Sequence, residues 1–476
     1  LTAMCVFFFF LVSFTDARWA MGFILAFCGG NVYYLLTRKY KKPLVWTARA
    51  KRIYMVAAFL SVIVMASSVL VFGYDAYSRI FIASVTSLGL YCGSHIIVLA
   101  AVWILVPVEK RINRNYYNEA KNILQSMPDL KIVGITGSYG KTSTKHYLHR
   151  ILSECYQTAM TPGSFNTTLG VIRTIREHLK PYDKVFIVEM GAKQPGDIKE
   201  ICELVHPSIG IITAVGEQHL ESFGSIENVQ KTKFELVDSL PADGLAVINN
   251  DFEKIADRKV NNTPCVRYAV SATGDASWTA ENVEYSERGT SFIAKGEGLE
   301  IPLATKLVGE CNISNLLACV AVAVHLGVPV DKIRYAVSRI EQVEHRLNLK
   351  RTPAGITIID DAFNSNPMGS AMALDVISRM TGGNRIVITP GMIELGERTE
   401  ELNRRFGEKM ASCADIAIVV GKYNREAIVA GLKDGGMPDG SVMLADTFAH
   451  AQQLLQGIVS FGDTVLYEND LPDTFK

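Results

Sequence analysis

Apolar residues form long runs in the first 110 residues of the chain and short runs afterwards. The long runs cover residues 1–14, 19–36, 53–73 and 80–107. Each of the last three is long enough to cross the ~30 Å hydrocarbon core of a bilayer as a helix, which takes about 20 residues. We therefore expect an α-helical transmembrane region of about four spans at residues 1–110. Because the sequence opens with Leu1 and not with methionine, we also expect it to begin inside the first run.

Beyond residue 110, short apolar runs that predict strands alternate with segments that have a helical pattern. The predicted strands lie at residues 185–188, 210–215, 356–359, 385–389, 416–420 and 464–467. Strands that alternate with helices are typical of a sheet whose strands are mainly parallel. With 476 residues, the chain has room for more than one domain. The sequence therefore predicts an α/β fold with a central domain at residues 111–340 and a C-terminal, Rossmann-like domain at residues 341–476.

The charge of the chain divides at the same place. The 48 basic and 48 acidic residues give a net charge of zero, but residues 1–110 hold ten basic and three acidic residues, which leaves the remainder at −7. A basic loop between the second and third long runs places both termini in the cytoplasm by the positive-inside rule. We therefore predict a multi-pass protein of the cytoplasmic membrane, with lipid as a partner. The neutral total argues against a nucleic-acid partner, and nine cysteines without a CxxC pair argue against structural zinc.

A glycine-rich loop joins a short apolar strand to a helical segment in KIVGITGSYGKTST, residues 131–144. Such a loop binds phosphates because backbone N–H groups and the helix dipole converge on the anion. Lys141 would neutralise the β- and γ-phosphates of ATP, and the Thr142 hydroxyl would bind Mg²⁺. The other expected nucleotide contacts of the loop are Gly137, Ser138, Gly140 and Ser143. The strict GxxxxGK[ST] spacing is not met, because Ile135 occupies the first glycine position.

Residues 134–145, GITGSYGKTSTK, closely resemble the ATP loop of the Mur ligases, which form amide bonds by activating a carboxylate as an acyl phosphate. The resemblance continues in the same order over residues 130–465. Its main segments are TPGSFNTTLGV at 161–171, EMGA at 189–192, EQHLESFG at 217–224, GECNISN at 309–315 and DDAFNSNP at 360–367. The chain most resembles the subgroup that adds D-Ala-D-Ala to the muramoyl tripeptide. This resemblance implies a Mur-ligase-like P-loop central domain, a C-terminal α/β ligase domain and a bacterial source.

The resemblance also implies metal ligands and catalytic residues. Glu189 follows an apolar strand, where a carboxylate needs a cation, and is expected to bind Mg²⁺, although it could instead cap the next turn. His219 matches a metal-binding histidine, but Mg²⁺ prefers oxygen and a lone histidine is more often structural. Lys233 matches a lysine that several Mur ligases carbamylate; a phosphate contact or a solvated helix face are the alternatives, with Lys231 as a competitor.

Arg346 would meet the γ-phosphate when the two domains close, unless it is only an exposed surface arginine. Lys141, Lys233 and Arg346 are the expected catalytic residues.

Further positions suit the nucleoside and the substrate. Asn312 and Asn315 could recognise adenine through their amides, or form a helix N-cap and its neighbour. Asp361 is a candidate for the ribose or for the ATP site at the domain hinge. Tentative substrate contacts are Asn166, Thr167, Asn364 and Asn366. The last two lie after a predicted strand, where α/β sites form, but the segment could equally be a turn.

Two features depart from the family pattern. The long apolar runs stand where the usual ligase has its UDP-sugar-binding domain, and ENDLPD at residues 468–473 replaces a basic KGSR-type segment. We predict an ATP- and Mg²⁺-dependent carboxylate–amine ligase that joins D-Ala-D-Ala, or another amino-acid or dipeptide amine, to a muramoyl-tripeptide cell-wall precursor at the membrane. The alternatives are an amide ligase for a lipid-linked or polymeric substrate, and a membrane scaffold or regulator with a vestigial nucleotide site.

Overall fold

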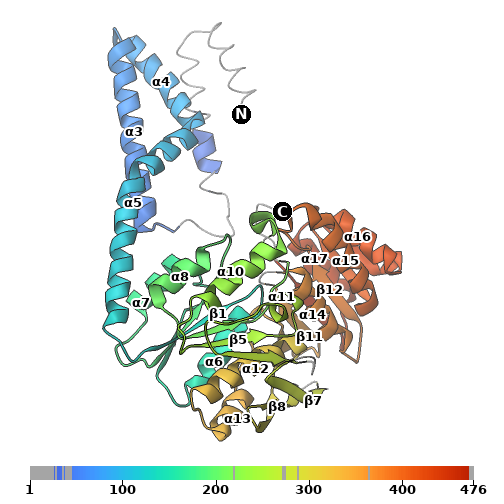
Figure 1. Cartoon of the computed structure of the whole chain (residues 1–476). Coiled ribbons are helices and arrows are strands. Elements are labelled where there is room, and N and C mark those ends of the chain that lie inside the picture. The colour runs from blue at the N-terminus through green and yellow to red at the C-terminus, as the bar shows by residue number, and fades with distance from the viewer. Residues whose placement is uncertain are drawn as a thin grey trace. The chain divides into compact units, whose positions relative to one another are not determined.

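The computed structural model divides the chain into two compact units, Leu1–Asn115 and Tyr116–Lys476 (Figure 1). The residues that it describes are 26, 29–34, 37, 45–217, 220–270, 275–286, 289–362 and 365–470. The predicted boundaries after residues 110 and 340 stay predictions.

The described part of the first unit is mainly helical. Its principal helices are α3 (Ala48–Phe72), α4 (Ala76–Cys92) and the first part of α5 (Ser94–Gln125). Thr47 caps the start of α3 by accepting a hydrogen bond from the Ala50 N–H, and a capping box between Asp75 and Ser78 begins α4. The predicted run at residues 80–107 is therefore two helices that meet at Gly93, and not one.

The predicted multi-pass location in the cytoplasmic membrane is wrong. Among the described residues, α3 is the only single helix that is long and apolar enough to cross a membrane. Ser78–Cys92 and Ser94–Gln125, which are bent by 70° relative to each other, could form a second span only if they are counted together as one. The transmembrane nature of residues 1–110 is therefore not confirmed. The runs at 1–14 and 19–36 fall largely outside the described residues.

The second unit contains two sheets. The first has nine strands in the order β2-β3-β1-β4-β5-β6-β7-β8-β9. Its strands are β1 (Lys131–Thr136), β2 (Thr158–Met160), β3 (Val185–Glu189), β4 (Ile209–Ile212), β5 (Leu245–Asn249), β6 (Cys265–Ala269), β7 (Trp278–Ser286), β8 (Gly289–Gly296) and β9 (Leu299–Thr305). The pairs from β2 to β7 are parallel, whereas β7, β8 and β9 pair antiparallel.

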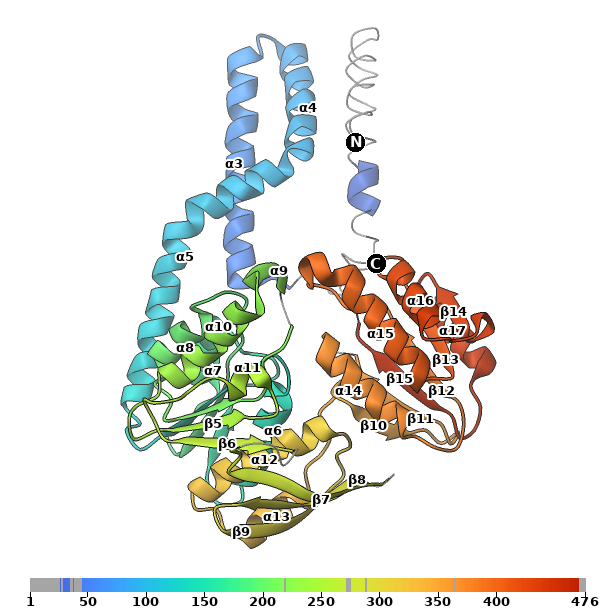
Figure 2. The ribbon, with the colours of Figure 1, turned by 45° about the vertical axis from the view of Figure 1, so that its right-hand side comes forward.

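Helices cover both faces of the parallel part of this sheet (Figure 2). On one face, α6 (Lys141–Leu152), α12 (Glu310–His325) and α13 (Val330–Ser338) pack in one apolar core. The opposite core contains residues of α7 (Thr168–Glu177), α8 (Asp197–Val205), α10 (Ile226–Asp238), α11 (Glu253–Ala256) and the end of α5. The short helix α9 (Leu220–Phe223) precedes α10. Because both faces are buried, the inner strands are mainly apolar, with polar residues at their ends.

The second sheet has six strands in the order β10-β11-β15-β12-β13-β14. They are β10 (Asn348–Arg351), β11 (Thr357–Asp361), β12 (Arg385–Thr389), β13 (Ile416–Val420), β14 (Val442–Ala445) and β15 (Thr464–Glu468), and only β10 is antiparallel to its neighbour. One face packs against α14 (Pro367–Ser378), α15 (Thr399–Cys413) and α16 (Arg425–Asp434), and the other against α17 (Phe448–Ile458). The short helices η1 (Gly396–Arg398) and η2 (Asp439–Ser441) lie in connecting loops.

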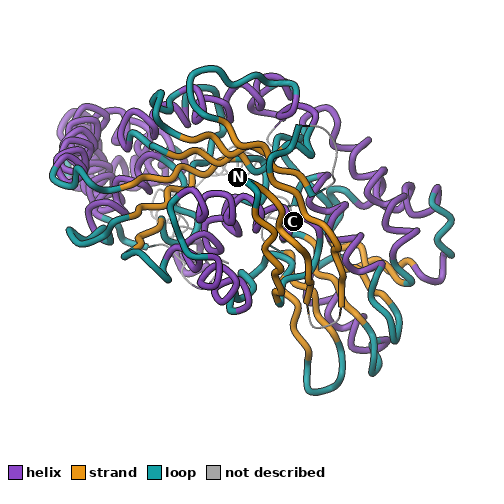
Figure 3. Tube along the Cα trace, turned by 60° about the horizontal axis from the view of Figure 1, so that its bottom comes forward, coloured by secondary structure: helices purple, strands orange, loops and turns teal. Residues whose placement is uncertain are grey.

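The predicted α/β class is confirmed, with both strands and helices in this unit (Figure 3). Both sheets are mixed and not purely parallel. The loops that follow β1, β2 and β3 leave the same edge of the first sheet, because parallel strands end together. The glycine-rich loop follows β1, the segment with Asn166 follows β2, and Glu189 ends β3. This edge is where the predicted site residues gather.

Candidate active site

The glycine-rich loop spans the four residues between β1 and the first residue of α6. Ser138 fixes the loop to the segment after β4, because its hydroxyl donates to the Gly216 carbonyl and accepts from the Gly216 N–H. Lys141 begins α6 and so places its side chain and the free backbone N–H groups of the helix start on the same side. The predicted strand–loop–helix arrangement, which suits an anion, is therefore present.

Gly140 is the N-cap of α6 and has a left-handed φ of 79°. A Cβ atom there would lie 2.5 Å from Oδ1 of Asn315, which accepts a hydrogen bond from the Thr144 hydroxyl. Glycine is thus required both by the backbone conformation and by the close approach of α12.

We expect Gly140→Ala to lower the free energy of unfolding by about 1–3 kcal/mol, from left-handed strain of roughly 1–2 kcal/mol plus the displacement of Asn315. Nucleotide affinity should fall with it. The matched control is Gly196→Ala, since Gly196 is also a left-handed helix N-cap, at φ 94°, but has open space where its Cβ would stand. Equal losses of stability in the two variants, measured by denaturant unfolding, would show that the contact with Asn315 does not matter.

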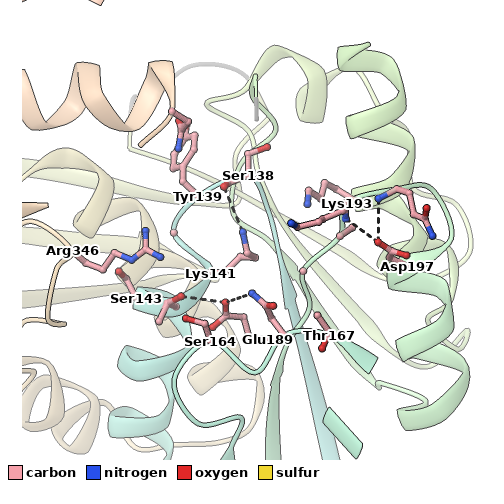
Figure 4. Close-up of a pocket in the computed structure, with 18 residues that line it drawn as sticks. Ser138, Tyr139, Lys141, Ser143, Ser164, Thr167, Glu189, Lys193, Asp197 and Arg346 are labelled. Atoms are coloured by element: carbon pink, nitrogen blue, oxygen red, sulfur yellow. Dashed lines mark hydrogen bonds between the residues drawn. The ribbon is translucent and has the colours of Figure 1, made fainter. Parts of the chain in front are cut away.

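A pocket of about 390 Å³ opens at the end of the glycine-rich loop (Figure 4). Many of the predicted site residues line it: Ser138, Gly140, Lys141, Thr142, Ser143, Asn166, Thr167, Glu189, Lys233, Arg346 and Asn366. This volume falls in the range of small-molecule sites. The pocket therefore brings together segments that are more than 200 residues apart in the sequence.

Lys141 projects into the pocket from the start of α6, and its Nζ donates to the Gly137 carbonyl at 2.6 Å. Burial lowers the pKa of Lys141 to about 8; Glu189 opposes this shift and Arg346 adds to it. Lys141 and Arg346 are two cations next to the single carboxylate of Glu189, so this part of the pocket has an excess of positive charge. Such a site favours an anionic ligand that carries more than one charge.

Glu189 is buried at the end of β3, and its two carboxylate oxygens have different partners. Oε2 accepts from Nζ of Lys145 at 2.8 Å, and this lysine is itself fully buried. Oε1 accepts from the Thr142 hydroxyl at 3.2 Å and from Nδ2 of Asn166 at 3.1 Å. Burial disfavours the ionised carboxylate, but Lys145, Lys141 and these hydrogen bonds outweigh it, so that the pKa of Glu189 lies below its usual value. Glu189 is therefore an ionised side chain of the pocket and not a cap of the following turn.

Lys145 was not among the predicted site residues. Its Nζ also donates to the Gly163 carbonyl at 2.6 Å, which ties the segment after β2 to Glu189. The available signal was its position in α6, one helical turn after Lys141, since residues four apart lie on the same face.

Lys233 is buried on α10 at 2% exposure and lines the pocket, whereas its competitor Lys231 is exposed. The alternative of a solvated helix face is therefore excluded for Lys233. Burial and, to a smaller extent, Lys141 lower the pKa of Lys233 to about 7. A substantial fraction of its amine is thus neutral near pH 7 and able to act as a nucleophile.

Arg346 reaches the pocket from the turn before β10, on the side opposite Lys193 and Asp197 (Figure 4). His345 and Leu347 have positive φ values of 58° and 47°, so this turn is tightly folded around the arginine. The Leu347 N–H donates to Asp361 at 3.1 Å, and Asp361 opposes the lowering of the Arg346 pKa by burial. Arg346 is partly buried, and not the exposed surface arginine of the alternative interpretation.

Asn312 and Asn315 lie away from the pocket lining, inside the first turns of α12. Oδ1 of Asn312 accepts from the Tyr147 hydroxyl and its Nδ2 donates to the Val308 carbonyl, while Asn315 accepts from Thr144. The residue at the helix N-cap is Gly309, so neither asparagine is the cap that the alternative proposed. The predicted contact with adenine stays a prediction.

Of the remaining predicted residues, some line the pocket and others lie outside the described part of the chain. Asn366 lines the pocket and caps α14, because its Oδ1 accepts from the Gly369 N–H. Thr167 caps α7 in the same way. His219 and Asn364 lie outside the described residues. Within the described part of the chain, no three histidine, cysteine, aspartate or glutamate side chains gather in a way that could hold a metal ion.

A phosphate-binding loop at the edge of a parallel sheet, with lysines, a buried carboxylate and an arginine around one pocket, defines an α/β enzyme that uses a nucleoside triphosphate. Residues 135–323 match the family model of the Mur ligase middle domain, and residues 345–467 match the model of the Mur ligase, glutamate ligase domain. The chain belongs to the Mur ligase family. As predicted from the sequence, it is an ATP-dependent acid–amino-acid ligase.

Similar proteins include two UDP-N-acetylmuramoyl-tripeptide–D-alanyl-D-alanine ligases. The Escherichia coli enzyme is 30% identical over 310 residues, which cover 63% of this chain and 67% of that one. The Bacillus subtilis enzyme is 26% identical over 355 residues, or 73% and 75% of the two chains. Among solved structures, MurF ligase from Thermotoga maritima in complex with ADP has a TM-score of 0.68 at 24% identity, over 75% of this chain and 80% of that one. MurF from Acinetobacter baumannii has the same score and identity, over 75% and 77%.

Proposed function

We propose that this protein adds D-Ala-D-Ala to a UDP-linked muramoyl tripeptide, using ATP to activate the tripeptide carboxylate as an acyl phosphate. The names of the E. coli and B. subtilis relatives support this substrate. The observation that carries the proposal is the pocket that Lys141, Glu189 and Arg346 share. A central ATP-binding domain at 111–340 and a C-terminal ligase domain at 341–476 would meet at this pocket.

Phosphoryl transfer needs positive charge and alignment more than covalent chemistry from the protein. Lys141 would hold the β- and γ-phosphates from the start of α6, while Arg346 would hold the transferred group from the turn before β10. The substrate carboxylate attacks the γ-phosphorus, and ADP leaves. The amine then attacks the acyl carbon, phosphate leaves, and the nitrogen loses a proton to form the amide. Asn166, Thr167 and Asn366 would position the two substrates.

The side chains in the pocket fit Mg²⁺. The Thr142 hydroxyl and Oε1 of Glu189 are oxygen donors 3.2 Å apart, and oxygen is the ligand type that Mg²⁺ prefers. Thr142 and Glu189 would hold the ion, and when bound it would neutralise charge on the phosphate oxygens. His219 remains a candidate third ligand from the family resemblance alone.

Lys233 is proposed to act in its carbamylated form. Its burial and its lowered pKa, about 7, support this, because carbon dioxide reacts with a neutral amine. A carbamate would place a negative group on α10 near the cation Lys141. Without the modification, Lys233 would contact phosphate directly.

The test is ADP release by the full chain with each substrate omitted in turn. We expect release only when ATP, the UDP-linked muramoyl tripeptide and D-Ala-D-Ala are all present, with one amide formed per ADP. A parallel reaction replaces the UDP-linked precursor with its lipid-linked form, and another replaces the dipeptide with single amino acids. Turnover with the lipid-linked form alone, or with a different amine alone, would overturn the proposed substrate while leaving the ligase class intact.

A further inference from the structure

Two carboxyl groups lie side by side in the second sheet, at the ends of adjacent parallel strands. Asp361 ends β11 and Glu468 ends β15, and these two residues are paired in the register of the strands. Glu468 is only 1% exposed. Two ionised carboxylates so close together in a buried site repel each other strongly, so a pair of this kind normally retains one proton.

The hydrogen-bond partners show which of the two keeps its negative charge. Asp361 accepts from the Leu347 N–H and faces the Arg346 guanidinium, and both oppose the rise in its pKa that burial causes, so that the pKa of Asp361 reaches only about 6. Glu468 has only neutral partners: its Oε1 accepts from the Ser365 hydroxyl at 2.6 Å. Its Oε2 is buried and has no partner among the described residues. An ionised oxygen without a donor is much more costly to bury than an oxygen of a neutral carboxyl group.

We propose that Glu468 is a neutral carboxylic acid in the working enzyme, so that Asp361 is the ionised member of the pair and its negative charge interacts with Arg346. Glu468 is then a positioning residue, since it acts on the pocket through Asp361 and the arginine. Its link to catalysis rests on the function proposed above for Arg346. A second negative charge at Glu468 would draw the guanidinium toward the sheet and away from the phosphate pocket.

The charges around Glu468 agree with this assignment. Burial and, to a smaller extent, the charge of Asp361 raise the pKa of Glu468 to about 8, although the Ser365 and Ser370 hydroxyls on the α14 side oppose the shift. Asp360, on the same strand as Asp361, is paired with His345 and Lys350. The one cation that acts on the pair directly is Arg346, and it acts on Asp361.

The hydrogen bonds around Glu468 also connect it to Asn366, a second residue of the pocket. Ser365 and Ser370 are hydrogen-bonded to each other, and the Ser370 hydroxyl also lies 2.9 Å from the carbonyl of Asn366, to which it can donate. Asn366 begins α14 and lines the pocket beside Arg346. Glu468 thus supports both pocket residues that come from the second sheet.

The first test is thermal unfolding of the full chain between pH 5 and 9, in wild type, Glu468→Gln and Glu408→Gln. Glutamine keeps the shape of the neutral acid but cannot ionise, and Glu408 is an exposed control on α15. The folded state keeps a proton that the unfolded chain releases above pH 4.5, so rising pH favours unfolding up to about pH 8. We expect the Tm of wild type and of Glu408→Gln to fall relative to Glu468→Gln across this range. A constant difference in Tm would overturn the neutral acid.

The second test is kcat against pH for the same three proteins, with KM for ATP measured alongside. At pH 9, one unit above the pKa of Glu468, the kcat of wild type should have fallen about tenfold further than that of Glu468→Gln, because any loss through Lys141, whose pKa is about 8, is common to both proteins. A Glu468→Gln kcat more than tenfold below wild type at pH 7 would mean that the ionised form is needed, and would overturn the proposal. If no substrate gives turnover, the proposed function fails, and the Tm comparison still decides whether Glu468 is neutral.

Discussion

Replacing Lys141 with alanine is expected to lower kcat/KM by about 10²–10³-fold, or ~2.7–4 kcal/mol of transition-state stabilisation. Lys141 is the pocket cation at the start of α6, with its Nζ held 2.6 Å from the Gly137 carbonyl. Charge develops on the phosphate oxygens during transfer, and an alanine leaves that charge without its counterion. Steady-state ADP release over a range of ATP concentrations, with the other two substrates saturating, measures the effect.

The matched control is Lys180→Ala, because Lys180 is exposed and far along the chain from the glycine-rich loop. Its kcat/KM should equal that of wild type, and both variants should unfold at wild-type denaturant concentrations. A Lys141→Ala enzyme that retains more than a third of wild-type kcat/KM would disprove the assignment of the phosphate pocket.

Replacing Lys145 with methionine is expected to lower the free energy of unfolding by about 3–5 kcal/mol, since it leaves the buried carboxylate of Glu189 without its ion-pair partner. Both members of this ion pair are at most 1% exposed, and their atoms are 2.8 Å apart. The Gly163 carbonyl also loses its donor. Urea unfolding followed by circular dichroism gives the difference.

The control for Lys145 is the double variant Lys145→Met/Glu189→Leu, in which no charge remains buried. Replacing both ions by apolar groups is often near neutral, so the double variant should be more stable than Lys145→Met alone. Additive losses in the two single variants and the double variant would show that Lys145 and Glu189 do not stabilise each other.

Several of the parallel strands were predictable because their apolar runs are short and bounded by polar residues, whereas the parallel strands β2, β5, β6 and β14 were not predicted. β12 and β13 lie at the predicted residues 385–389 and 416–420. β15 extends one residue beyond its prediction, because the backbone of Glu468 still pairs with Asp361 although its side chain is acidic. The antiparallel strands β7 to β9 were missed, although β8 and β9 alternate between buried and exposed positions, as a strand with one solvated face does. The long apolar runs near the N-terminus were read as spans because hydrophobicity alone does not register a helix break such as that at Gly93.

The candidate site was predictable where its chemistry lies within one short segment, as in the glycine-rich loop. It was not predictable where function depends on a partner far along the chain. The pairing of Glu189 with Lys145 joins residues 44 positions apart, and the amide of Asn312 is held by Tyr147, 165 positions away. Sequence patterns name the residue types, but the fold alone decides which side chains meet.

The most direct test of the account is the fate of oxygen in a muramoyl tripeptide whose terminal carboxylate carries ¹⁸O. If ATP activates this carboxylate as an acyl phosphate, each amide formed must transfer one ¹⁸O atom to the released phosphate, as mass spectrometry of the phosphate would show. Released phosphate that contains only unlabelled oxygen, with ADP still formed, would mean that water attacks ATP and would contradict the ligase mechanism.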